Sequence, residues 1–314
     1  MRHIRWTDSS WRSDQVGAMQ YFSWENVSCS ISNIKSSCTQ GSIPVFAVNA
    51  TWPEHIRATI QFASTNNLRL VIKATGHDLL GRSTAFGSLL LWLHYMKNMT
   101  LIPQYSSVMV LQYRMLFLSL LYYFYVLNEI DPTSYNGIVG SRLIPETIVR
   151  NQTDTLAQAF LQMKRQSLSF SQLTISMVSG GQASNTSNKY NSVNPAWHTA
   201  LLHVFYAKGW PDDASVELQQ ASAVQISRQI QMLDTLANGD QLACYMNEAD
   251  PNEPNWQHRF FGSQTLYNRL KSVKQKYDPS GLFVDNGYHG DPYDAKSTRS
   301  PFPDGTTGSG FQLV

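Results

Sequence analysis

The chain is poor in charge and in cysteine, and it contains no internal repeat. Charged residues make up 15% of its 314 residues, against about 25% in an average soluble protein. The absence of heptads, collagen-like triplets and charge blocks excludes coiled coils, collagen and wholesale disorder. Lys and Arg are scattered and the net charge is only +2, so we expect no nucleic-acid partner. Three cysteines are too few for a zinc site of four cysteine ligands, and no metal site is predicted.

The N-terminal stretch also lacks the apolar core of a signal peptide. MRHIRWTDSSWRSD is polar throughout, so no signal peptide is predicted. Cys29 and Cys38 lie in a loop-like stretch, where a disulfide and two free thiols stay open as alternatives. Cys244 is predicted to be a small buried side chain. Five N-x-S/T sequons hint at secretion and glycosylation, at Asn26, Asn49, Asn98, Asn151 and Asn185.

The clearest pattern of secondary structure lies between residues 43 and 93. An apolar run at 43–48 predicts a strand, 53–66 predicts a helix with Pro at its start, and the β-branched run 68–74 predicts a second strand. This strand–helix–strand order favours a right-handed βαβ crossover with a parallel pair of strands. Residues 89–93 predict the next strand.

Residues 108–127 form a long run rich in Leu and Tyr. The run matches the length that crosses a bilayer, about 20 residues. It contains Gln112, Arg114 and several tyrosines, and no basic flank sets an orientation. We therefore expect a buried segment and no membrane partner, with a membrane anchor as the alternative.

The second half of the chain alternates strand and helix patterns that lead to an α+β fold. The predicted elements are a helix from an N-cap at Asn151 through Gln166, a strand at 173–178, a strand at 201–207, a helix from Asp212 or Asp213 to Leu236, a strand at 242–246 and an amphipathic helix at 263–277. The Gly-, Ser- and Pro-rich tail at 291–314 is expected to be disordered.

The densest cluster of chemistry-bearing residues, KATGHDLLGRS, directly follows the second predicted strand. Gly76 and Gly81 permit a positive φ and a close approach of the backbone to a ligand. Successive N–H groups in such a loop can cradle a diphosphate, and Arg82 and Ser83 can add contacts. The loop matches neither G-x-G-x-x-G nor a Walker A motif, so a phosphate-binding loop and a plain turn stay open on physical grounds.

Three stretches of the sequence carry a family resemblance. RLVIKATGHDLLGRSTAFGSLLLW closely resembles the first flavin-binding stretch of the berberine-bridge-enzyme-like FAD-linked oxidoreductases, of the vanillyl-alcohol-oxidase (PCMH-type) superfamily and of fungal type. The preceding CTQGSIPVFAVNATWPEHIRATIQFA is similar to the same family. YMNEADPNEPNWQHRFFGSQTLYNRLKSVKQKYDPSGLF resembles its C-terminal berberine-bridge segment. With weaker matches around 139–145 and 194–197, the resemblance covers most of residues 25–290.

The resemblance implies a role for each matching residue. His77 would be bonded covalently to the 8α-methyl group of FAD. The residues implied to line the pyrophosphate and flavin are Thr75, Gly76, Asp78, Gly81, Arg82 and Ser83. Tyr245 would be catalytic, with a pKa lowered by nearby positive charge or by the flavin, and Asn247 would face the flavin beside it.

The implied activity is oxidation of a small molecule that bears a hydroxyl group, either a carbohydrate or a secondary metabolite. Hydride would pass to the flavin, and oxygen is the expected acceptor. The family also implies secretion. The acidic residues Glu248, Asp250 and Glu253 are expected to form a solvated loop rather than a cation site, and Trp256, Phe260 and Phe261 are expected to pack against the sheet.

The sequence departs from the family in its middle. No Gly-rich segment completes the FAD domain after Ser83, no second flavin-linking Cys is present, and Ala74 replaces an expected polar residue. An inactive or non-enzymatic remnant of such an enzyme is therefore an alternative hypothesis. The expected divisions are the N-terminal part of a PCMH-type FAD domain at 25–105, an anomalous insert at 106–135, a substrate domain of mixed sheet and helix at 136–245, and a berberine-bridge segment at 246–290 whose helix returns to the N-terminal part.

Overall fold

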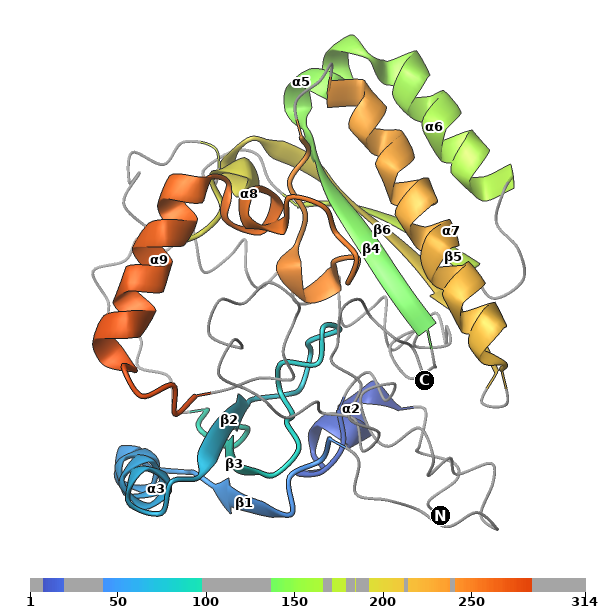
Figure 1. The fold of residues 1–314 in the computed structure, drawn as a ribbon. Helices are drawn as coiled ribbons and strands as arrows, with labels where there is room; N and C mark the ends of the chain where they lie inside the picture. The colour runs from blue at the N-terminus through green and yellow to red at the C-terminus, as the bar shows by residue number, and fades with distance from the viewer. Residues whose placement is uncertain are drawn as a thin grey trace.

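The computed structural model describes residues 8–19, 42–97, 137–165, 171–178, 184, 192–211, 214–237 and 241–283. The fold is α+β, as predicted, with a parallel sheet at the bottom of Figure 1 and an antiparallel sheet with its helices at the top. The run 108–127, the Cys29–Cys38 alternative and the tail at 291–314 lie outside the described residues. In the part that is described, no helix combines the length and hydropathy needed to cross a bilayer.

The parallel sheet contains β1 (Phe46–Asn49), β2 (Arg69–Lys73) and β3 (Ser88–Trp92), and α3 (Pro53–Thr65) connects β1 to β2. The predicted strand–helix–strand unit is thus confirmed. β1 and β2 do not pair with each other, because β3 lies between them and pairs in parallel with both. Every residue of β3 is buried, whereas β1 and β2 each expose residues, so β3 takes the central position.

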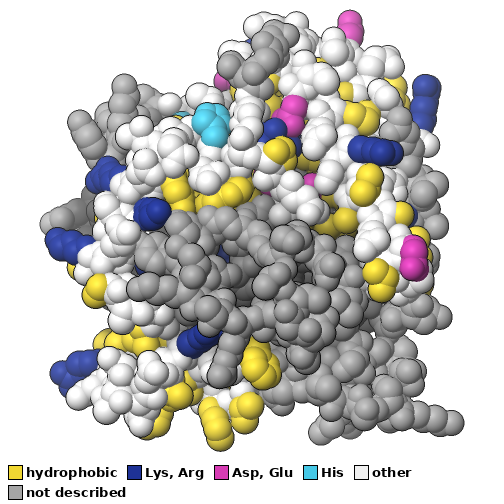
Figure 2. Space-filling view, in the orientation of Figure 1, with side chains coloured by type: hydrophobic (Ala, Val, Ile, Leu, Met, Phe, Trp, Pro, Cys, Tyr) yellow, Lys and Arg dark blue, Asp and Glu magenta, His cyan; other side chains and the backbone are white. Residues whose placement is uncertain are grey.

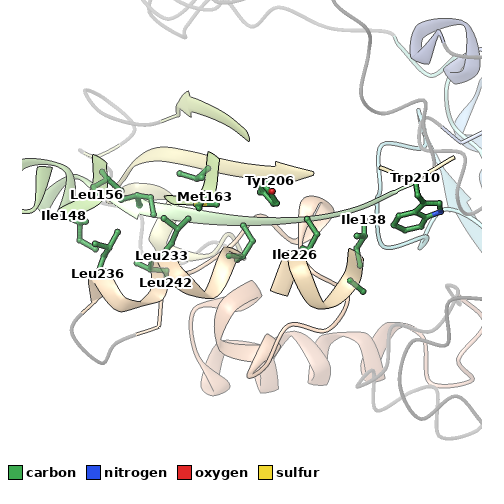
Figure 3. Close-up of a cluster of buried hydrophobic side chains, with 14 residues drawn as sticks. Ile138, Ile148, Leu156, Met163, Tyr206, Trp210, Ile226, Leu233, Leu236 and Leu242 are labelled. Carbon is green, nitrogen blue, oxygen red and sulfur yellow. The ribbon is translucent and has the colours of Figure 1, made fainter. Parts of the chain in front are cut away.

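The antiparallel sheet contains β4 (Gly137–Pro145), β5 (Ser171–Met177) and β6 (Ala200–Gly209) in the order β4-β6-β5. The helices α5 (Glu146–Asn151), α6 (Thr153–Arg165) and α7 (Val216–Asp234) cover one face, and Figure 3 shows the apolar core between them and the sheet. Gly140 of β4 allows α7 to approach closely, since a Cβ there would lie 2.7 Å from Ile230 Cγ1.

Two predicted helix starts in this half were misplaced. Asn151 does not cap α6, because it ends the short helix α5, and α6 begins at Thr153. The N-cap of α7 is Ser215, whose hydroxyl accepts a hydrogen bond from Leu218 N–H at 3.3 Å. Asp212 and Asp213, the predicted caps, lie outside the described residues.

The C-terminal segment, residues 242–283, contacts both sheets. Residues 242–246 do not form the predicted strand; Leu143 N–H of β4 donates to Ala243 O at 2.8 Å, and the chain then turns into the 3-10 helix η6 (Met246–Glu248). The helices α8 (Trp256–Phe261) and α9 (Gln264–Tyr277) follow. After α9, Leu70 N–H of β2 donates to Leu282 O at 2.8 Å, so the residues that follow the helix return to the N-terminal part.

A buried charge network fixes this segment to the antiparallel sheet. Arg142 of β4 and Arg259 of α8 both donate to Asp234 at the end of α7; Arg142 also donates to Glu253, and Arg259 forms an ion pair with it. Hydrogen bonds from the two guanidinium groups hold the pKa of Asp234 below its usual value in spite of burial. Glu253 and Asp250 are almost fully buried, so the prediction of a solvated acidic loop was wrong for both.

The sequence did not predict the short helix α2 (Ser9–Ser13), and the turn that follows it contacts the end of β2. The ammonium group of Lys73, 1% exposed, donates to the carbonyl oxygens of Gln15, Val16 and Ala18. These bonds satisfy the buried charge and hold the last residue of β2 in place. The loop that carries His77 begins directly after it.

Candidate functional site

The loop from Ala74 to Thr84 leaves the carboxyl end of β2, the edge of a parallel sheet where ligands usually bind. Its second half is organised around Asp78. The Asp78 carboxylate accepts hydrogen bonds from Leu80 N–H at 3.2 Å and from Arg82 N–H at 2.8 Å, and it pairs with the Arg82 guanidinium at 3.0 Å. Asp78 and Arg82 therefore stabilise the loop, and the Nε and Nη2 groups of Arg82 are engaged with Asp78 and Asn247.

The first half of the loop differs from the second half in the hydrogen bonding of its backbone N–H groups. Among the described residues, the N–H groups of Gly76, His77 and Asp78 donate to no protein group, whereas those from Leu79 to Arg82 are all engaged. Gly76 has a φ of 84° and Gly81 a φ of 80°, as the two turns require. The N–H groups that remain available to bind an anion are therefore those of residues 76–78. Consecutive free N–H groups next to a glycine with a positive φ can bind a phosphate group.

The open face of the antiparallel sheet lies against this loop. Side chains alternate along β6, so Val204 and Tyr206 enter the helix-covered core while His203, Phe205 and Ala207 point the other way. Leu79 of the loop packs on Phe205, Ala207 and Val139. The loop of one sheet therefore contacts the helix-free face of the other.

The Tyr-Met-Asn motif (residues 245–247) contacts both the His77 loop and the helix-free face of the antiparallel sheet. Leu79 N–H donates to Asn247 O at 3.0 Å, and the Arg82 guanidinium donates to Asn247 Oδ1. The Asn247 amide in turn donates to the hydroxyl oxygen of Tyr245 at 3.0 Å. The structure thus brings Tyr245 and Asn247 together with the His77 loop, although the two motifs are far apart in the sequence.

Tyr245 lies in an aromatic corner that sequence reasoning missed. Its ring meets Trp197 at 5.6 Å and His203 at 6.0 Å between ring centroids, edge to face in both cases. Burial, followed by the charge of Glu248, raises the pKa of Tyr245. The expected lowering of this pKa does not prevail, because burial and the charge of Glu248 outweigh the opposite effects of the Asn247 hydrogen bond and the Arg82 charge. The alternation of His203 with Phe205 and Ala207 was the signal that could have revealed His203.

Glu248 is enclosed at the centre of the site. Its Oε1 lies 3.6 Å from His77 Nε2 and its Oε2 lies 3.6 Å from His203 Nε2. Burial raises the pKa of Glu248 to about 7 and lowers that of His203 to about 4. The solvated-loop prediction was therefore wrong for Glu248 as well. No group of three His, Cys, Asp or Glu side chains in the described part has the geometry of a metal site.

The remaining predicted residues lie on the loop itself. Thr75 is exposed, Ser83 is half-buried, and Gly81 N–H donates to Asp78 O at 3.2 Å. Trp256, Phe260 and Phe261 belong with Leu80 to an apolar cluster around Cys244 whose described members include no strand residue; Cys244 is free and buried as predicted. Through Leu80, this cluster packs against the loop.

Comparison with known proteins identifies the C-terminal segment. Residues 244–286 match the family described as "Berberine and berberine like". A FAD-linked oxidoreductase of Arthroderma benhamiae is 50% identical over 98 residues, which cover 29% of this chain and 17% of that protein. The FAD-linked oxidoreductase patO of Aspergillus clavatus is 31% identical over 159 residues, which cover 50% of this chain and 27% of that protein. The chain thus spans less than a third of the length of these relatives.

Solved structures reproduce the fold. The VAO-type flavoprotein MtVAO713 of Myceliophthora thermophila superposes with a TM-score of 0.71 at 17% identity, over 90% of this chain and 87% of that chain. MtVAO615 of the same organism gives a TM-score of 0.71 at 18% identity, over 91% of this chain and 87% of that chain. The predicted resemblance and fold class are therefore confirmed.

Proposed function

Since this chain is related to the berberine-bridge-like FAD-linked oxidoreductases and has the fold of VAO-type flavoproteins, we propose that it is a FAD-dependent oxidoreductase. Its substrate is a small molecule with a hydroxyl group, a carbohydrate or a secondary metabolite. Oxygen is the proposed electron acceptor. The proposed setting is secretion, as the family resemblance implies.

One observation carries this proposal: the His77 loop, the Tyr245–Asn247 motif and the helix-free face of the antiparallel sheet meet at one place. The contacts of Leu79 with both Phe205 and Asn247 O bring the three together. The His77 loop offers backbone N–H donors, and the helix-free face with Tyr245 offers aromatic rings. This combination suits a cofactor with a charged diphosphate and a flat apolar ring.

The residues present fit FAD in a limited and specific way. The free N–H groups of Gly76, His77 and Asp78 would hold a phosphate oxygen. The His77 side chain, 37% exposed, is accessible for the proposed covalent bond to the flavin. We propose that Thr75 and Ser83 add hydroxyl contacts, whereas Gly81 and Arg82 act through the shape of the loop. The flavin, when bound, supplies the hydride-accepting chemistry.

The proposed role of Tyr245 is to orient the substrate hydroxyl. Its hydroxyl oxygen accepts from Asn247, which leaves its own O–H available to donate to a substrate oxygen. A raised pKa keeps this proton on Tyr245 at neutral pH. Trp197 and His203 hold the Tyr245 ring in place by edge-to-face contacts. Tyr245 thus serves as a donor rather than as the proton acceptor expected from the resemblance.

A second candidate function is a folded remnant without a cofactor. The observation that favours it is β1, an edge strand among the described residues, where Phe46 is 73% exposed and the preceding Val45 is 66% exposed. Figure 2 shows hydrophobic side chains on the surface in the region of α3 and β1. An uncovered apolar edge of this kind is expected where a flavin domain lacks neighbouring strands.

An absorbance spectrum of the purified full chain separates the two candidates. Yellow colour in the flavin region that stays with the protein after acid precipitation supports the oxidoreductase. A folded protein that remains colourless after incubation with excess FAD contradicts it and favours the remnant. Oxygen consumption with a panel of sugars and small alcohols then tests the substrate class.

A further inference from the structure

One carboxyl group faces two imidazole rings from different sheets. Glu248 belongs to η6, His77 to the loop after β2, and His203 to β6. Each carboxylate oxygen lies 3.6 Å from one Nε2 atom. A hydrogen bond would require about 3 Å, so a side-chain shift of about half an ångström converts either contact into a hydrogen bond.

The backbone around Glu248 fixes this arrangement. Glu248 N–H donates to Tyr245 O at 3.0 Å and closes the turn of η6. The preceding residue, Asn247, accepts Leu79 N–H of the loop. The carboxyl group is therefore delivered to His77 by a turn that is itself bonded to the His77 loop.

Within the described residues, no permanently charged group neutralises Glu248. The groups that face it are His77, His203 and the ring of Tyr245, and in the described part of the chain no Lys or Arg pairs with it. His203 is neutral at physiological pH because burial lowers its pKa to about 4, and its Nε2 has no hydrogen-bond partner among the described residues. A carboxyl group in this setting takes up and releases a proton near pH 7, in agreement with its raised pKa.

We propose that Glu248 is a positioning residue for His77: it accepts a hydrogen bond from His77 Nε2–H and thereby keeps the lone pair on Nδ1, the atom that would bond to the flavin. This inference rests on the proposed function, because it assumes that FAD binds beside His77. Neutral imidazole carries one proton, and the group that accepts it decides which nitrogen keeps the lone pair. Glu248 is placed at Nε2, so Nδ1 is the remaining nucleophile.

The bond formation balances without a further reagent. A bond forms between His77 Nδ1 and the carbon of the flavin 8α-methyl group, and one C–H bond of that methyl group breaks. The electron pair of the C–H bond stays on the flavin, which is thereby reduced by two electrons. The Nε2 proton passes to Glu248 and the methyl proton is released, and these two protons end on the reduced flavin. Oxygen, the proposed acceptor, then takes up the electron pair with both protons and is reduced to hydrogen peroxide.

The first arm of the test measures the rate at which the purified apoprotein binds added FAD covalently, by flavin fluorescence of the denatured protein on a gel. The variants are Glu248→Gln and, as the control, the half-exposed Glu146→Gln. We expect E248Q to bind FAD but to attach it about a hundredfold more slowly, as for the loss of a general base. E146Q should match the wild type. The wild-type rate should rise with pH and level off above about 7, whereas the residual rate of E248Q should not follow this profile.

The second arm reads the imidazole without FAD. Nitrogen NMR of histidine-labelled protein, with His77→Ala to assign the signal, should show the proton of wild-type His77 on Nε2 and a changed tautomer ratio in E248Q. Equal attachment rates and equal tautomer ratios in E248Q and the wild type would overturn this inference alone. A wild-type chain that takes up no FAD would overturn the proposed function and the attachment role together.

Discussion

Glu248 shows how a single residue acquires its chemistry from its surroundings. The sequence places it in an acidic stretch, NEADPNE, that is typical of a solvated loop. In the fold it is enclosed by two imidazole rings and an aromatic ring, and burial alone raises its pKa from 4.5 to about 7. A carboxylate that titrates near neutral pH costs stability whenever it is charged.

This cost predicts a pH-dependent effect of Glu248→Gln on stability. The folded-state pKa is raised, so the contribution of Glu248 to stability is fully present below pH 4.5 and is lost as the pH rises through about 7. E248Q should match the wild type near pH 5 and exceed it at pH 8 by up to about 3 kcal/mol, the value of a shift of about 2.5 pKa units. Denaturant unfolding at both pH values measures this difference.

Glu146→Gln serves as the control for this experiment, because the Glu146 side chain is 45% exposed and pairs with the exposed Arg150. It should change stability by less than about 1 kcal/mol at either pH. His203 titrates in both proteins and cancels from the comparison. An E248Q protein that is no more stable than the wild type at pH 8 would show that Glu248 is better solvated than its contacts indicate.

The residues that the sequence identified and those it did not differ in the range of their contacts. The His77 loop was predicted because its glycines, Asp78 and Arg82 are neighbours that organise one another locally. The roles of His203 and Glu248 depend on β6 and η6 meeting a loop that is far away in the chain. No local pattern encodes such a meeting, so both were missed.

At the scale of elements, β4 was missed for a related reason. The stretch GIVGSRLIP contains two glycines and an arginine, which argue against a buried strand. Gly140 is required there by the close approach of Ile230, and the charge of Arg142 is neutralised by Asp234 and Glu253 from later elements. The stability of β4 therefore depends on its contacts with α7 and the C-terminal segment.

The network at β4 predicts a large effect of Asp234→Ala. Asp234 accepts from both Arg142 and Arg259, so its removal leaves two buried guanidinium groups with one shared carboxylate, Glu253. We expect a loss of about 3–5 kcal/mol, as for a broken buried ion pair. The exposed Asp154 in the first turn of α6 gives the control, and Asp154→Ala should cost less than about 1 kcal/mol. Similar losses in both variants would contradict the structural role of the network.

At the scale of the whole molecule, the C-terminal segment connects the parallel sheet to the antiparallel sheet. After α9, Leu282 and Phe283 return to the apolar cluster around Leu70 of β2, while α8 and Arg259 attach to the antiparallel sheet. The same segment carries Tyr245, Asn247 and Glu248 between the two sheets. The family resemblance predicted this return, which periodicity alone does not encode.

This connection predicts that Phe283→Ala destabilises the parallel sheet. Phe283 packs on the Leu70 cluster and lies 5.5 Å from the Lys274 ammonium group, measured to the ring centroid. Since the ring is half-buried, we expect a loss of about 2 kcal/mol, below the range for a core aromatic residue. Tyr277→Ala, which removes an aromatic ring that is 75% exposed, should be nearly neutral. Hydrogen exchange of the Leu70 amide would reveal the opening, and equal effects of the two variants would contradict it.

The central claim is that the loop after β2 and the helix-free face of the antiparallel sheet enclose FAD next to His77. The most direct test is the absorbance spectrum of acid-precipitated wild-type protein and of His77→Ala, each after incubation with FAD. The account predicts flavin that stays with the wild-type precipitate and is released from H77A. Wild-type protein that releases all of its flavin, or that binds none, would contradict it.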